Sequence, residues 1–192
     1  MKRVLKYIRK YTPALVLSLL LAGLTVLLTL YIPILTGNAV DLIIGKGGKG
    51  SILTLTERSS DLLLMEKFPE GKKAACLPRV VSRLLFPYRG KGVKTITTDN
   101  GSEFACHELI TKKSGATVYF ADCYCSWQKG AIENANKLVR QYIPKGTDFN
   151  TITDHSIKEI QKKINRRPRE KLDFRSPKEC FFEKWEQQKW AV

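Results

Sequence analysis

The sequence lacks the cysteine and histidine spacings of a zinc site. Its 192 residues include five cysteines and two histidines, none in a C-x-x-C or H-x-x-x-H pattern. Cys123 and Cys125 form the one close cysteine pair, and a metal role for them is a minor alternative. The default expectation is small, buried, reduced thiols in a cytosolic protein.

Acidic residues are absent from the first 40 positions, and residues 11–40 carry no charge of either sign. Basic residues precede this apolar stretch at Lys2, Arg3, Lys6, Arg9 and Lys10. A hydrocarbon core needs roughly 20 apolar residues as a helix, and residues 11–35 meet that length. The pattern predicts a transmembrane helix with its N-terminus in the cytoplasm. A signal peptide is disfavoured because its apolar region would be about 7–15 residues long.

No later apolar run reaches spanning length, and no Gly-rich phosphate loop ending in Lys-Ser or Lys-Thr is present. These absences matter because residues 1–45 resemble the start of the membrane domain of ABC-type exporters. The resemblance includes the segment at residues 32–41, which reads IPILTGNAVD. An exporter cannot be assembled from one helix without its ATPase. The alternative reading is therefore a membrane-inserted exporter fragment with a non-functional passenger domain.

Positive charge dominates the chain as a whole. Lys and Arg outnumber Asp and Glu by 33 to 18, which gives a net charge of +15. A protein this basic favours a polyanionic partner, and nucleic acid is the obvious one.

Two acidic residues stand in settings that suit metal-assisted phosphoryl transfer. Asp99 ends a short β-branched strand, residues 95–98, and is followed by an Asn-Gly turn. Glu133 lies near the start of a predicted helix. Acids at a strand end and on a facing helix can converge on hard cations, which prefer oxygen ligands. Two such ions can clamp the attacking and leaving oxygens of a phosphodiester. An ordinary hairpin turn and a solvated helix residue are the alternatives.

The sequence around these acids resembles the catalytic core of DDE transposases and retroviral-type integrases. The closest resemblance is to the family of bacterial insertion sequence thirty. Residues 129–145, KGAIENANKLVRQYIPK, are similar to that family's signature, as are residues 165–169, NRRPR, and 174–179, FRSPKE. The sequence departs from the family at Lys129, usually Arg, and at Lys137, usually Gly.

The order of elements predicts an α/β, RNase-H-like fold, a mixed five-stranded sheet with helices on both faces. A first segment, residues 1–40, made of the basic N-terminus and one transmembrane-type helix, would precede this core, residues 41–192. Strands are expected at residues 42–44, 51–57, 61–68, 93–98 and 117–121. Helices are expected at residues 74–88, 102–114, 128–143, 148–167 and 176–190. In the helix at 102–114, Phe104, Leu109 and Ile110 should face inward.

The resemblance implies three catalytic carboxylates, Asp41, Asp99 and Glu133. Together they would hold two Mg²⁺ or Mn²⁺ ions, which activate water, then a DNA 3′-hydroxyl, and stabilise the leaving oxygen. Asp41 has the family's downstream context, a hairpin formed by residues 42–44, a turn at 45–50 and residues 51–57, but residues 38–40 replace the usual Trp-Glu pair. An acid at the exit of a membrane helix is the alternative for Asp41. The candidate DNA-binding residues are Asn100, Lys129, Asn134, Lys137, Arg140, Arg166, Arg167 and Arg169. Asn136, on the same side of the helix as Lys137 and Arg140, is also expected to follow the phosphate backbone, with a solvated face as the alternative.

The implied function is DNA strand transfer on transposon ends and target DNA, performed by a homo-oligomer. Family members carry a helix-turn-helix segment ahead of the core, and a membrane-type helix occupies that place here. The simplest hypothesis is a truncated or fused copy. Its catalytic core belongs in the cytoplasm, whereas the chain would reside at the plasma membrane if residues 11–35 insert.

Overall fold

The computed structural model describes residues 13–14, 16–26, 37–48, 50–68, 75–88, 93–122 and 129–190. The chain divides into two compact units, Met1–Leu35 and Thr36–Val192. In the first unit, residues 13–14 and 16–26 are helical with exposed side chains.

The predicted transmembrane helix is not found. Within the described ranges, no helix is long and apolar enough to cross a membrane. Residues 11–12, 15 and 27–35 of the predicted span lie outside the described ranges.

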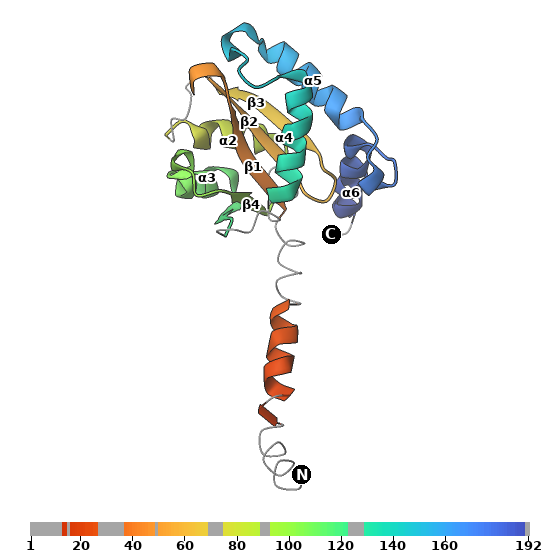
Figure 1. Cartoon of the computed structure of the whole chain (residues 1–192). Coiled ribbons are helices and arrows are strands. Elements are labelled where there is room, and N and C mark those ends of the chain that lie inside the picture. The colour runs from red at the N-terminus through yellow and green to blue at the C-terminus, as the bar shows by residue number, and fades with distance from the viewer. Residues whose placement is uncertain are drawn as a thin grey trace. The chain divides into compact units, whose positions relative to one another are not determined.

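The second unit is built on one mixed sheet, as the sequence predicts, with strand order β3-β2-β1-β4-β5 (Figure 1). The strands are β1 Asn38–Ile44, β2 Ser51–Glu57, β3 Leu63–Phe68, β4 Thr95–Thr98 and β5 Thr117–Phe120. The first three pair antiparallel, whereas β4 runs parallel to both β1 and β5. The predicted hairpin of β1 and β2 is confirmed. However, β1 begins at Asn38, inside the segment assigned to the membrane-type region.

Helices cover both faces of this sheet. They are α2 Leu77–Leu85, α3 His107–Ser114, α4 Gly130–Tyr142, α5 Asp154–Arg166 and α6 Pro177–Trp190. Short 3-10 helices are η1 Lys46–Gly48, η2 Phe86–Tyr88, η3 Ser102–Phe104, η5 Phe149–Thr151 and η6 Glu170–Leu172. In Figure 1, α4 crosses the sheet beside α5, whereas α2 and α3 lie near each other and apart from α4 and α5.

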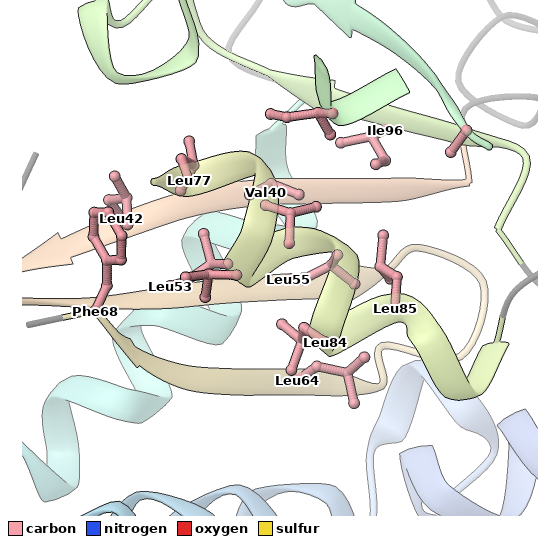
Figure 2. Close-up of a cluster of buried hydrophobic side chains, with 14 of the residues drawn as sticks. Val40, Leu42, Leu53, Leu55, Leu64, Phe68, Leu77, Leu84, Leu85 and Ile96 are labelled. Atoms are coloured by element: carbon pink, nitrogen blue, oxygen red, sulfur yellow. The ribbon is translucent and has the colours of Figure 1, made fainter. Parts of the chain in front are cut away.

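Alternation along the strands separates two apolar cores. Val40, Leu42 and Leu53 point to one face, where they meet the apolar stripe of α2 (Figure 2). Ile43 and Ile52 point to the other face and pack against α4 and α5. Asp41 lies between Val40 and Leu42 in β1. Strand alternation therefore turns its side chain toward the α4 face.

One inward-facing prediction is wrong. Phe104 and Ile110 are buried, but Leu109 is 47% exposed. The expected single helix is broken into η3 and α3, with a turn at residues 105–106. The break changes the helical phase, so the spacing counted from Phe104 no longer predicts which side of α3 faces the core.

Helix α5 covers the outer edge of β3 with its side chains. The Asn165 side chain accepts from Leu63 N at 2.9 Å and donates to Leu63 O at 2.7 Å. Gln161 Oε1 accepts from Met65 N at 2.7 Å, and Lys158 Nζ donates to Met65 O at 2.7 Å. These bonds occupy backbone groups that an edge strand otherwise leaves open for pairing.

Ser176 caps α6, the helix predicted at residues 176–190. Glu179 N donates to Ser176 Oγ at 3.3 Å, and Ser176 N donates to Glu179 Oε2 at 3.0 Å. Pro177 occupies the first helical position, where no N–H is needed. The reciprocal pair is a capping box, which fixes where α6 begins.

Candidate active site

The pairing of β1 with β4 brings two predicted carboxylates to the same place. The parallel register matches Asn38 with Ile96 and Ala39 with Thr97. This pairing ends two residues before Asp41 on β1 and two residues before Asp99, which directly follows β4. The charge of Asp99 acts on the ionisation of Asp41, which agrees with this placement.

The carboxylate of Asp41 is held at both oxygens. Leu42 N donates to Oδ1 at 2.8 Å, and Asn136 Nδ2 donates to Oδ2 at 2.8 Å. Burial raises the pKa of Asp41 above its ordinary value of 3.8, while the hydrogen bond from Leu42 opposes that rise. The negative charges of Asp99 and Glu103 raise the pKa further, and Lys129 lowers it.

Asp99 has one satisfied oxygen and one unsatisfied oxygen. Lys129 Nζ donates to its Oδ2 at 3.0 Å and forms an ion pair. Its Oδ1 is buried and has no hydrogen-bond partner among the described residues. A buried carboxylate oxygen without a partner is expensive. The atom is therefore free to accept a cation.

Helix α4 presents one stripe of residues to this edge of the sheet. Lys129, Glu133, Asn136 and Arg140 follow one another at spacings of four, three and four, which places them on one helical face. Lys129 reaches Asp99, and Asn136 reaches Asp41. Arg140 donates to Ile44 O at 3.5 Å.

Glu133 belongs to this stripe, between the residues that contact Asp99 and Asp41. Its side chain is exposed. Within the described ranges, no three His, Cys, Asp or Glu side chains gather closely enough to hold a metal ion. The structure thus brings Asp41 and Asp99 together and leaves Glu133 outside a closed three-carboxylate cluster.

The donor set suits a hard divalent cation. Asp41 and Asp99 offer carboxylate oxygens, the ligands that Mg²⁺ and Mn²⁺ prefer. The unsatisfied Oδ1 of Asp99 and the repulsion between the two carboxylates are both relieved by positive charge. Lys129 already supplies part of that charge. The residues present therefore fit such an ion at the Asp41–Asp99 pair.

The predicted DNA-binding residues on and around α4 differ in their surroundings. Asn100, Asn134 and Lys137 are exposed. Lys129 is half-buried against Asp99, and Arg140 is half-buried, donating to Pro144 O at 3.4 Å.

The predicted basic turn after α5 is only partly open to solvent. Arg166 and Arg167 are exposed, and Arg167 donates to Gln141 Oε1 at 3.4 Å. Arg169 is half-buried, and burial lowers its pKa. Its backbone pairs with Arg175 in an isolated β-bridge. Arg169 therefore has a structural setting that its two neighbours lack.

Sequence reasoning missed three participants of this site. Asn136 was assigned to the phosphate backbone, whereas its amide contacts Asp41 and Thr54. Thr54 and Glu103 received no role. Helical spacing from Glu133 puts Asn136 on the site's face, but its partner on β1 is distant in sequence. Cys123 and Cys125, the minor metal alternative, lie outside the described ranges.

The chain matches known transposases over most of its length. It is 44% identical over 142 residues to the transposase for insertion sequence element IS4351 of Bacteroides fragilis. It is 35% identical over 134 residues to transposase InsI for insertion sequence element IS30A of Escherichia coli K12. These matches cover 74% and 69% of this chain but only 43% and 35% of the relatives. The chain thus spans less than half the length of these relatives.

A solved structure shares the fold. The catalytic core domain of BIV integrase superposes with a TM-score of 0.59 at 19% identity, covering 79% of this chain and 96% of that domain. No protein-family model matches the sequence. The transposase relatives and the integrase-core fold agree with the motifs at Asp99 and Glu133. Over the segment that it shares with them, the chain belongs to the family of DDE transposases of IS30-type insertion sequences.

Proposed function

We propose that this chain carries the catalytic core of a DNA transposase, which cleaves and joins phosphodiester bonds with the help of divalent metal ions. The observation that carries the proposal is the nearness of two acids: β1 pairs with β4 just before Asp41 and Asp99, and the charge of Asp99 raises the pKa of Asp41. The transposase relatives and the integrase-like fold support the choice of DNA as substrate.

In this proposal Asp41, Asp99 and Glu133 hold two Mg²⁺ or Mn²⁺ ions. A bound ion of this kind stabilises charge on the attacking and leaving oxygens of the phosphodiester. Glu133 is exposed on the helical face that also carries Lys129 and Asn136. Lys129 contacts Asp99 and Asn136 contacts Asp41, so Glu133, the acid between them on this face, is the α4 residue that can complete the ligand set.

Basic residues around the carboxylates would hold the DNA backbone. Lys137 and Arg140 follow Glu133 along α4. Arg166 and Arg167 are exposed at the end of α5, and Arg167 contacts Gln141 on α4. Such contacts position DNA without reading its sequence. Asn100 and Asn134, each beside a carboxylate, are proposed to orient the scissile phosphate.

The proposed partners are transposon ends and target DNA, and the proposed working form is a homo-oligomer. The catalytic core would act in the cytoplasm, where DNA is present. The relatives reported above are transposases, so the exporter alternative has no support from them.

The test is cleavage of supercoiled plasmid DNA by the full chain with Mn²⁺. Asp99→Asn and Glu133→Gln should each reduce cleavage on the order of a hundredfold or more, because losing a ligand exceeds the 10–100-fold typical of outer-shell changes. Glu186→Gln, an exposed acid on α6, is the matched control and should cleave normally. Equal cleavage by all four proteins, above a no-protein background, would remove these carboxylates from the mechanism.

A further inference from the structure

Asn136 joins three elements of the sheet and helix layer through one amide group. Its Nδ2 donates to Asp41 Oδ2 on β1 at 2.8 Å. Its Oδ1 accepts from Thr54 Oγ1 on β2 at 2.9 Å. Thr54 is fully buried, and it pairs with Asp41 in the β1–β2 ladder.

The Asp41 carboxylate determines which way the amide points. An ionised carboxylate only accepts hydrogen bonds, so the amide nitrogen of Asn136 faces it and the amide oxygen faces Thr54. The Thr54 hydroxyl lies 3.1 Å from Asp41 O and 2.9 Å from Asn136 Oδ1, and its single hydrogen is shared between these two acceptors. Thr54, on the strand next to the one that carries the acid, therefore supports the orientation that Asp41 sets.

The carboxylate of Asp41 then has little freedom to rotate. Leu42 N holds Oδ1, and Asn136 holds Oδ2. Each carboxylate oxygen keeps a further lone pair for another ligand. Outer contacts of this kind commonly set the orientation of a metal ligand.

We infer that Asn136 is a positioning residue: it orients the Asp41 carboxylate for cation binding and fixes α4 over β1, so that Glu133 lies one turn away. The inference rests on the proposed function, because it assumes that Asp41 receives the ion. It differs from a role on the DNA backbone, since both polar atoms of the amide are engaged within the protein.

Mn²⁺ binding to the full chain, measured by calorimetry without DNA, tests this inference. Asn136→Ala should weaken binding by about 10-fold or more, the effect of removing an outer-shell partner. Gln141→Ala changes an exposed amide on the same helix and should stay within about twofold of the unmodified chain. Circular dichroism checks that each variant retains its helices.

Thr54→Val removes the hydroxyl that contacts the amide oxygen of Asn136 and should weaken Mn²⁺ binding in the same direction by a smaller factor. If Asn136→Ala does not fold, Thr54→Val decides in its place. Unchanged Mn²⁺ affinity in the deciding variant, while the unmodified chain binds, overturns the positioning role alone. An unmodified chain that binds no Mn²⁺, or an Asp99→Asn variant that binds equally well, overturns the proposed function instead.

Discussion

The ammonium nitrogen of Lys129 lies 3.0 Å from Oδ2 of Asp99. This ion pair joins the start of α4 to the end of β4, and it neutralises one of two carboxylates that repel each other.

Removing the Lys129 charge should favour metal binding. A divalent ion at Asp99 competes with the ammonium, so Lys129→Met is expected to tighten Mn²⁺ binding. The change should be about two- to fivefold, since a partly exposed ion pair is worth up to about 1 kcal/mol. Calorimetry of the full chain measures it, with Lys145→Met, an exposed lysine, as the control. Weaker binding by Lys129→Met alone would show that the lysine organises the site rather than competing for it.

Asp41 should make the metal-free protein less stable at neutral pH. Its pKa is raised in the folded state, so the fold binds this proton more tightly than the unfolded chain does. Stability from this group is therefore present below the ordinary value of 3.8 and falls as pH rises through the higher folded pKa. Asp41→Asn is expected to raise the free energy of unfolding by about 0.5–2 kcal/mol at pH 7.

Urea denaturation at pH 7 and at pH 3.5 checks this dependence. The advantage of Asp41→Asn should shrink at pH 3.5, where the carboxyl is largely protonated in both states. Saturating Mg²⁺ should stabilise the unmodified chain and leave Asp41→Asn unchanged. An advantage of equal size at both pH values would assign it to packing instead of charge.

The contact between Asn165 and Leu63 should be important for stability. Asn165→Leu leaves the buried N–H and C=O of Leu63 without partners. The expected loss is about 2–4 kcal/mol, because each unsatisfied buried group costs about 1–3 kcal/mol. Gln161→Leu removes a single bond to Met65 and should lose about half as much. Urea denaturation compares the two, and a loss below that of Gln161→Leu would contradict the edge-covering role of Asn165.

Much of the sheet could be predicted from the sequence because alternation and turns mark strands locally. The start of β1 could not. Ala39 and Val40 close a stretch without charged residues that begins at residue 11, and the lack of charge alone does not separate a buried strand from a helix. Strand pairing, which is a long-range property, assigns them to the sheet.

The candidate site divides in the same way. Asp99 and Glu133 were identified by their local motifs, and Asp41 by the hairpin that follows it. The contacts of Asn136 join positions far apart in the chain, Asp41 and Thr54. No local pattern predicts such a pairing, so its amide was assigned to solvent-facing DNA contacts.

Helix α4 has a consequence beyond the chemistry on its polar stripe. Away from this stripe, Ala135 and Val139 of α4 pack into the core, together with Ile143, which follows the helix. A rigid rod that carries several contacts moves them together, so a sliding of α4 by a fraction of a turn would alter the spacing at Asp99 and Asp41 at once. Substitutions at the buried Val139 can therefore change the positions of Asp41 and Asp99 relative to α4.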